Sequence, residues 1–288
     1  MKILVTGASG RVGRATVAEL REHGHDVLGI DQAPSPDGPD GGPVVDLADF
    51  GQVVETMSGV DDRLGGFDAV VHLGAVPAPG RRPNATIFAN NAVSGYNVLA
   101  AARMLGIDKV VWASSETVLG LPFDAPPPYL PVDEEYTVRP ESTYSLGKAV
   151  EEEMARHFAR WQPDASIIGL RFSNVLTDDD YARFDSWQDD LAARSWNLWG
   201  YIDHRDAAQA VRLAVEADRR GAEVFIVVAD DTVMRRPSVE LLTGELADLE
   251  RRAPIEGRAT LLSNAKAKRE LGFQPRYSWV DRVDGAEA

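Results

Sequence analysis

The sequence of 288 residues contains no cysteine. This absence excludes disulfide bonds, cysteine-ligated zinc sites, iron–sulfur clusters and thiol nucleophiles. No stretch reaches the roughly 18 consecutive apolar residues that a membrane-spanning helix needs, and the chain starts with a strand-like run rather than with a signal peptide. We therefore expect a cytoplasmic protein without a membrane partner.

Positive charge is also scarce. The chain has 30 Lys and Arg against 45 Asp and Glu, a formal net charge of −15. Such an excess of acidic groups disfavours binding to phosphate backbones, so no nucleic-acid partner is expected. The 5 His residues show neither an HExxH motif nor a paired spacing, so no metal site is expected either. The chemistry must come from hydroxyls, carboxylates and the few lysines.

Short apolar runs alternate with longer stretches of helical periodicity through the first two thirds of the chain. This alternation is typical of a parallel sheet with helices on both faces, the Rossmann-type doubly wound α/β fold. The predicted strands are Lys2–Thr6, Asp26–Ile30, Val44–Val45, Ala69–Leu73, Lys109–Ala113, Ser166–Arg171 and Glu223–Val228. The predicted helices are Val12–His23, Phe50–Met57, Thr86–Leu105, Ser142–Trp161, Arg205–Arg219, Ser238–Arg251 and Asn264–Leu271.

After Arg171 the regular alternation gives way to an acidic, aromatic segment before it resumes near Arg205. We interpret residues 1–172 plus 202–230 as the dinucleotide-binding domain. Residues 173–201 plus 231–288 are predicted to form a small C-terminal substrate-binding lobe.

A glycine-rich turn follows the first predicted strand and opens the first predicted helix, with the sequence TGASGRVG from Thr6 to Gly13. In a dinucleotide-binding unit the first glycine permits the tight turn, the second lets the backbone approach the pyrophosphate, and the third lets the helix pack closely. Asp31 ends the second strand, where a carboxylate accepts hydrogen bonds from both hydroxyls of a dinucleotide's ribose and repels a 2′-phosphate. The pattern favours NAD over NADP, although an ordinary glycine-rich turn and a strand-end turn residue remain the alternatives.

Tyr144 and Lys148 are four residues apart in a predicted helix, so their side chains lie on one face. A neighbouring ammonium favours the phenolate, so Lys148 is expected to lower the pKa of Tyr144 from about 10 towards neutrality. Tyr144 then becomes a general base for a hydroxyl proton. The alternative is a solvated helix turn with no chemical role.

With these motifs the chain resembles the extended short-chain dehydrogenase/reductases, also called the NAD-dependent epimerase/dehydratase family, and is nearest to its sugar and uronate dehydrogenases. The resemblance implies that Asp46 and Leu47 lie at the adenine, that the segment from His72 to Ala75 lines the cofactor, and that Asn91 is a structural residue of a helix beside it. The cofactor-binding residues implied are Gly7, Ser9, Gly10, Arg11, Val12, Gly13, Asp31, Asp46, Leu47, Leu73, Gly74, Ala75, Asn91, Tyr144 and Lys148.

The resemblance also implies a catalytic set of Ser115, Tyr144 and Lys148. In the family the lysine bonds the nicotinamide ribose, and a Ser or Thr at the end of the fifth strand orients the substrate oxygen. Ser115 matches that hydroxyl because Gly120 follows it at the family's spacing, and Ser114 is the second candidate.

Departures from the family pattern narrow the reaction. Dehydratases of the family carry Asp-Glu after the catalytic hydroxyl, whereas this chain has Glu116-Thr117, so dehydration is disfavoured. Glu116 is either a substrate-binding or second acid/base group, or a cap of the following turn. Nucleotide-sugar enzymes of the family usually have more residues after the sixth strand, which form the pocket for the nucleoside diphosphate. Here only about thirty residues separate Asn174 from the helix near Arg205, so the resemblance favours a small substrate over a nucleotide sugar.

Three further residues are implied as substrate ligands. Ser173 and Asn174 end a strand where the family bonds sugar hydroxyls, although both residues are equally suited to cap the turn. The segment from Tyr181 to Trp187 is similar to the uronate dehydrogenase loop in which an Arg holds the substrate carboxylate, which makes Arg183 the candidate. Because acidic residues surround Arg183, a local salt bridge is the alternative.

We therefore expect an NAD-dependent dehydrogenase that oxidises a hydroxyl of a small sugar or sugar acid. The alternatives are a nucleotide-sugar epimerase of the same family and a non-catalytic dinucleotide sensor. By resemblance, a homodimer is expected.

Overall fold

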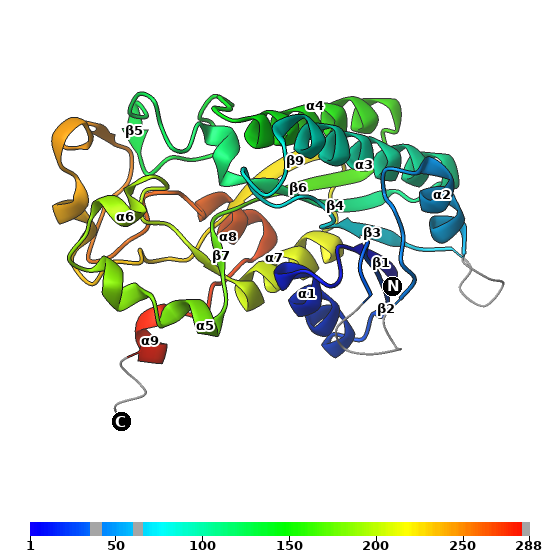
Figure 1. Ribbon diagram of the computed structural model, residues 1–288, viewed down its shortest axis with the longest axis horizontal. Helices are drawn as coiled ribbons and strands as arrows, with labels where there is room; N and C mark the ends of the chain where they lie inside the picture. The colour runs from blue at the N-terminus through cyan, green and yellow to red at the C-terminus, as the bar shows by residue number, and fades with distance from the viewer. Residues whose placement is uncertain (35–41, 60–65, 284–288) are drawn as a thin grey trace.

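A computed structural model describes residues 1–34, 42–59 and 66–283 of the chain. A central parallel sheet lies between two layers of helices, with a more irregular region at one end (Figure 1). Within the part described, no helix is long and apolar enough to cross a membrane.

The central sheet has six parallel strands in the order β2-β1-β3-β4-β6-β9. The strands are β1 (Lys2–Thr6), β2 (Asp26–Ile30), β3 (Ala69–His72), β4 (Lys109–Ser115), β6 (Ser166–Phe172) and β9 (Gly221–Val227). After β2 the chain crosses to the other side of β1, so the strand order reverses between β1 and β3. In open parallel sheets, ligands bind beyond the carboxyl ends of the strands at such a reversal.

Five longer helices cover the sheet, and they confirm the predicted doubly wound α/β fold. The helices α2, α3 and α4 lie on one face and α1 and α7 on the other (Figure 1). Their bounds are α1 Arg11–Glu22, α2 Phe50–Ser58, α3 Asn84–Leu105, α4 Thr143–Trp161 and α7 His204–Glu216. Both faces of the sheet are covered, so its inner strands are buried almost throughout, as in β6, where every residue is buried, whereas the edge strands β2 and β9 are only partly buried.

Two of the predicted elements are wrong. The expected strand Val44–Val45 is reduced to a single bridge between Val44 and Asp31, with one hydrogen bond of 2.9 Å from the Val45 amide to the Asp31 carbonyl, which is too little for a strand. The expected helix Ser238–Arg251 is interrupted: it forms two 3₁₀ turns, η3 (Ser238–Leu241) and η4 (Gly244–Leu246), and a short strand β10 (Glu250–Arg251). Gly244 has a φ of 58°, which a continuous right-handed helix does not accommodate.

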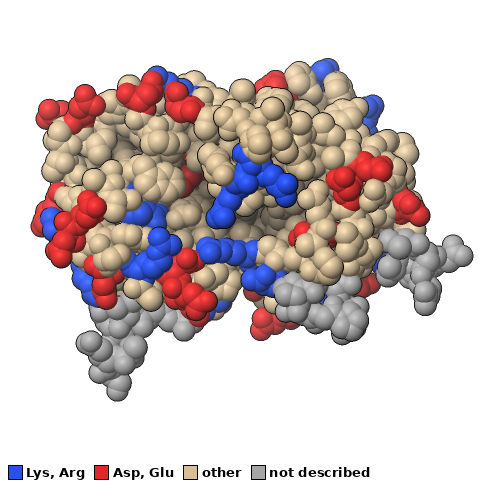
Figure 2. Space-filling model, viewed as in Figure 1, with Lys and Arg blue, Asp and Glu red and all other residues tan. Residues whose placement is uncertain are grey.

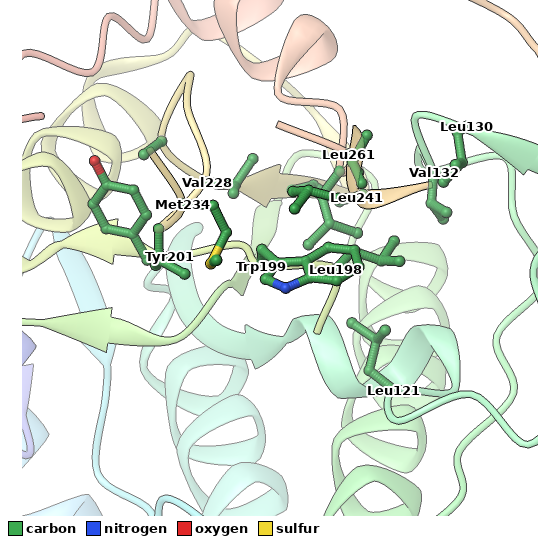
Figure 3. Packing of buried hydrophobic residues seen from close by; sticks show 14 of the residues in the cluster. Leu121, Leu130, Val132, Leu198, Trp199, Tyr201, Val228, Met234, Leu241 and Leu261 are labelled. Atoms are coloured by element: carbon green, nitrogen blue, oxygen red, sulfur yellow. The ribbon is translucent and has the colours of Figure 1, made fainter. Parts of the chain in front are cut away.

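A second hydrophobic core lies beside the sheet, under the irregular region (Figure 3). Trp199, Tyr201, Met234 and Leu261 pack there, together with Leu130 from the segment after β4. Its short elements are η1 (Glu116–Leu119), β5 (Tyr129–Leu130), β7 (Val175–Leu176), α5 (Asp178–Tyr181), η2 (Phe184–Trp187), α6 (Ala192–Ser195), β8 (Ile202–Asp203) and α9 (Trp279–Val283). We call this region the lobe. It borders the carboxyl ends of β4 and β6, so residues after these strands face both cores. The helix α8 (Ala265–Leu271) packs instead against β9 and α7.

Candidate active site

The glycine-rich turn between β1 and α1 has the geometry of a phosphate cradle. Gly7 has a φ of 69°, and a Cβ there would lie 2.6 Å from the Gly74 amide nitrogen. A Cβ at Gly13 would lie 2.0 Å from the Gly7 carbonyl oxygen, so only glycine lets α1 approach the turn. The N-cap Gly10 offers no side-chain acceptor, and the first turn of α1 has no acidic residue. The amides at this helix end are therefore available to an anion such as a pyrophosphate.

Asp31 lies directly after β2, where its carboxylate is held beside the glycine-rich turn. One oxygen accepts from the Ser9 amide at 2.9 Å and the other from the Ala33 amide at 3.3 Å. Asp46 accepts from the amide of Ala48 at 3.0 Å and caps the turn before α2. Asp31 is partly exposed and Asp46 is exposed, so both carboxylates are accessible to a ligand.

The segment after β3 passes close to the glycine-rich turn. The backbone of Leu73 and Gly74 approaches Gly7, and the Gly74 amide donates to the Thr6 hydroxyl at 3.1 Å. Asn91 of α3 holds the next residues: its side chain accepts from the Val76 amide at 2.8 Å and donates to the Val76 carbonyl at 3.1 Å. Asn91 therefore fixes the loop after β3 through the backbone of Val76.

The two serines at the end of β4 have different partners. Ser114 donates to Glu152 at 2.8 Å, and Glu152 also accepts two hydrogen bonds from Arg171, both of 2.8 Å. Ser114 is thus engaged in a buried ion-pair network. Ser115 accepts from the amide and the hydroxyl of Thr117, at 3.2 and 3.0 Å, and so caps η1. Its hydroxyl also faces Tyr144.

Tyr144 and Lys148 meet at the end of β4, both buried on one face of α4. The Lys148 ammonium donates to the Ala113 carbonyl at 2.8 Å and to Glu151 at 2.9 Å. Burial raises the pKa of Tyr144 above its ordinary value of 10.0, and Lys148 and Ser115 only partly oppose this effect. The expected net lowering of this pKa is therefore not found in the cofactor-free chain, because the phenolate loses more hydration than one partly neutralised lysine restores.

Glu116 begins η1, directly after Ser115, and is buried. It accepts from the Asn197 side chain at 3.1 Å. Burial raises the pKa of Glu116 to about 7, against the opposing effects of Ser173, Asn197 and Arg194. Glu116 does not cap the turn, because Ser115 does. A titratable carboxyl therefore lies beside the Ser115–Tyr144 pair.

Arg194 is the buried cation of this cluster. Its guanidinium donates to the Gly200 carbonyl at 2.9 Å and lies 4.7 Å from the centre of the Trp187 ring. Burial lowers the pKa of Arg194 to about 10, while Glu116 opposes the effect. Its Nε has no hydrogen-bond partner in the part of the chain that the structure describes.

Arg183 is exposed, and its guanidinium lies 5.7 Å from the centre of the Trp187 ring. The alternative of a local salt bridge is not realised among residues 1–34, 42–59 and 66–283: Asp178 pairs with Arg205, Asp180 with Arg11, and Asp185 with Arg235. The positive charge of Arg183 is therefore left for another anion.

The two halves of the site meet across a hollow in the molecular surface. Figure 2 shows Lys and Arg side chains along this hollow, although the chain as a whole is acidic. Arg11, at the start of α1, reaches across to Asp180 of α5 at 2.8 Å. Ser173 is buried at the end of β6 near Glu116, and Asn174, next in the chain, is partly buried.

Sequence reasoning missed Glu151, Arg194 and Asn197. Glu151 follows Lys148 by three residues on the same helix, so its spacing offered a signal. Arg194 and Asn197 reach Glu116 only through the fold of the lobe, and no local pattern marks them.

Comparisons with known proteins identify the family of the chain. The family model described as "NAD dependent epimerase/dehydratase family" matches residues 3–228. The L-arabinose 1-dehydrogenase (NAD(P)(+)) of Haloferax volcanii is 30% identical over 75% of this chain and 83% of its own. The UDP-glucose 4-epimerase of Corynebacterium glutamicum is 27% identical over 96% of this chain and 92% of its own.

A solved structure is also similar over nearly the entire chain. A short-chain dehydrogenase/reductase superfamily protein from Agrobacterium tumefaciens, with bound NAD, is 26% identical and covers 99% of this chain and 96% of its own, with a TM-score of 0.74. The chain thus belongs to the NAD-dependent epimerase/dehydratase family and is an enzyme of the short-chain dehydrogenase/reductase type.

Proposed function

We propose that this enzyme oxidises a hydroxyl of a small sugar or sugar acid with NAD. The observation that carries the proposal is the meeting of Ser115, Tyr144 and Lys148 at the carboxyl end of β4, the same edge of the sheet at which the glycine-rich turn follows β1. A hydroxyl to be oxidised needs a hydrogen-bond partner, a proton acceptor and a nearby hydride acceptor, and this end of the sheet offers all three positions.

The chain's residues divide the work as follows. The Ser115 hydroxyl orients the substrate oxygen, and Tyr144 accepts the hydroxyl proton as the carbinol becomes a carbonyl. Lys148 stabilises the phenolate of Tyr144 and has a third hydrogen available for the nicotinamide ribose. NAD, when bound, accepts the hydride from the carbinol carbon.

The cofactor is proposed to lie along the turn from Gly7 to Gly13, with its pyrophosphate at the start of α1. Asp31 is placed to accept the hydroxyls of the adenosine ribose, and its negative charge opposes a 2′-phosphate. We therefore propose NAD in preference to NADP. Asp46, Leu47 and the segment Leu73–Ala75 are proposed to line the rest of the cofactor site.

A sugar acid fits the substrate side best. Arg183 is a cation without an acidic partner in the described structure, and a guanidinium binds a carboxylate through two parallel hydrogen bonds. Arg81 and Arg82, in the loop after β3, are exposed as well. We propose that residues 173–201 plus 231–288 supply most of the substrate contacts, with Ser173, Asn174 and Glu116 facing the sugar hydroxyls.

The test is NADH formation by the purified protein with NAD and a panel of aldoses, uronic acids and polyols. Turnover of a uronic acid is expected. Replacement Tyr144→Phe should lower kcat by at least about 100-fold while NAD still binds, because the hydroxyl is the only group removed. Equal turnover by the variant would contradict the role of Tyr144.

A nucleotide-sugar epimerase is the second candidate, because the relative matched over 96% of the chain is a UDP-glucose 4-epimerase. An epimerase reoxidises its NADH within one turnover, so it forms epimer without net NADH. The same panel extended with UDP-glucose separates the two reactions. A dinucleotide sensor would bind NAD and turn over nothing, and Tyr144→Phe would leave its cellular function intact.

The homodimer also remains a proposal, as does the cytoplasmic location. Large apolar side chains are exposed on α3 and α4, namely Tyr96, Met104, Leu146 and Trp161. Such side chains support an interface formed by these two helices. A monomeric mass in light scattering would contradict it.

A further inference from the structure

Two neighbouring carboxylates of α4 are buried, and the mechanism above uses neither. Glu152 is fully satisfied, because it accepts from Ser114 and twice from Arg171. Glu151 is different: one oxygen accepts from Lys148 at 2.9 Å, and Oε1 has no hydrogen-bond partner among the described residues. The side chains of Glu151 and Lys148 are each only 3% exposed. Burial raises the pKa of Glu151, and the Lys148 ammonium opposes this effect. A carboxyl group kept so deeply buried needs a reason.

The fold makes room for Glu151 at the contact between α3 and α4. A Cβ at Gly95 of α3 would lie 3.1 Å from the Glu151 Cγ and 3.5 Å from its carboxyl carbon. Even an alanine would crowd the side chain. The position of Glu151 is therefore defined by a close helix contact as well as by Lys148.

Lys148 is fixed from two sides. The Ala113 carbonyl accepts from its ammonium at 2.8 Å and Glu151 at 2.9 Å, while the Trp112 ring centre lies 5.8 Å away. These contacts use two of its three hydrogens and orient the third. Loss of Glu151 would leave a single acceptor, and the ammonium could turn about its long stem.

We propose that Glu151 is a positioning residue: it holds the ammonium of Lys148 in place and limits how strongly that positive charge acts on the Tyr144 hydroxyl. The inference rests on the proposed function only for the catalytic role given to Tyr144. The physical effect of Glu151 on Lys148 and Tyr144 is independent of the substrate.

The electrostatics of the surrounding groups agree with this role. Burial lowers the pKa of Lys148, but Glu151, through its charge and its hydrogen bond, together with Tyr144 and Glu152 more than offsets the effect, so the pKa of Lys148 is raised and Lys148 stays protonated. The same negative charge raises the pKa of Tyr144, as does Glu116 of η1. Glu151 thus favours the charged form of Lys148, but it also opposes the effect by which Lys148 lowers the pKa of Tyr144.

Two other titratable groups, Glu152 and His72, face Lys148. Glu152 faces Lys148 but is paired with Arg171 of β6. His72 of β3 faces Lys148 as well, and burial lowers its pKa to about 3, so it is neutral at working pH. Glu151 is therefore the carboxylate whose removal changes the charge at Tyr144 most directly.

The experiment is an NMR titration of the cofactor-free protein with isotope-labelled tyrosine, in which Tyr144 is identified from its missing signal in Tyr144→Phe. In Glu151→Gln, which keeps the shape and removes the charge, the midpoint of Tyr144 should fall by at least about half a pH unit. The matched control is Glu153→Gln on the same helix, where the carboxylate is 54% exposed and contacts Arg156. This control should leave the midpoint where it is.

Kinetics provide the second readout. The acid limb of kcat/KM should move to lower pH in Glu151→Gln by the same amount, and kcat at the optimum should fall because Lys148 is less well held. An unmoved or raised Tyr144 midpoint in Glu151→Gln overturns the inference, whatever the enzyme oxidises. A lowered midpoint in a protein that oxidises no sugar supports the inference and contradicts the proposed function instead.

Should Glu151→Gln fail to fold, Glu151→Asp is the second variant, since it keeps the charge but withdraws it from Lys148. A smaller fall of the midpoint is then expected. An unchanged midpoint in this folded variant overturns the inference too.

Discussion

The two sides of the active-site hollow are built differently. The cofactor side uses backbone: Gly7, Gly10 and Gly13 shape one turn, and the helix that follows supplies amides without a side-chain cap. The proposed substrate side uses buried side chains, among which the carboxyl group of Glu116 and the guanidinium of Arg194 lie in a poorly hydrated place. Steric constraints therefore dominate one side and electrostatics the other.

This difference bears on how substitutions should act. A backbone cradle suits any dinucleotide bound in the same way, whereas the charged side chains of the lobe are proposed to select the substrate. Substitutions on the cofactor side should weaken NAD binding, because a larger side chain collides with the backbone of the turn. Substitutions on the substrate side should shift a pH profile or a KM.

The largest effect is expected for Gly13→Ala on the cofactor side. Because the new Cβ would lie 2.0 Å from the Gly7 carbonyl oxygen, α1 must move away from the turn. NAD affinity should fall by at least about 100-fold, or about 2.8 kcal/mol. Isothermal titration with NAD measures the loss, and a melting curve without NAD shows whether the variant is folded. Unchanged affinity in a folded variant would contradict the steric account.

A smaller effect, on stability, is expected for Glu116→Gln on the substrate side. The pKa of Glu116 is raised from 4.5 to about 7 in the folded chain, so the folded state holds a proton that the unfolded chain has released. Its contribution to stability is complete below pH 4.5 and is lost as the pH rises through about 7. Relative to Glu116→Gln, the wild type should lose about 1–3 kcal/mol of unfolding free energy across this range.

Urea unfolding of both proteins at several pH values checks this sign. Parallel stability curves would show that burial of Glu116 is not coupled to its protonation. Electrostatics would then not distinguish the substrate side of the hollow from the cofactor side.

The smallest effect is expected for Arg183→Leu. The guanidinium is exposed, so the fold should not depend on it, but the KM for a uronic acid should rise about tenfold, as loss of a charged hydrogen bond implies. The KM for the corresponding neutral aldose is the internal control and should hardly change. An equal rise for both sugars would remove Arg183 from anion binding.

The cofactor side could be predicted well from the sequence because it is local. The glycines, β1 and Asp31 fall within one βαβ unit, and the predicted strands Lys2–Thr6 and Asp26–Ile30 have the bounds observed. Tyr144 and Lys148 are likewise one helical turn apart, so their shared face followed from periodicity.

The substrate side could not be predicted in the same way. Asn197 bonds Glu116 across 81 positions of sequence, and Arg194 reaches it through a loop whose course no periodicity specifies. The predicted helix Ser238–Arg251 failed for a related reason: its apolar residues pack into the core of the lobe from turns that Gly244 interrupts. The predicted lowering of the Tyr144 pKa was wrong, because the burial that raises this pKa cannot be read from the spacing of two residues.

The most direct test of the central claim uses a uronic acid carrying deuterium on the carbon to be oxidised. Hydride transfer at the Ser115–Tyr144 pair predicts deuterated NADH in solution, one equivalent for each sugar oxidised, and a lower kcat than with the ordinary sugar. Sugar epimerised without release of deuterated NADH, or NAD bound without any turnover, would contradict the proposed dehydrogenase.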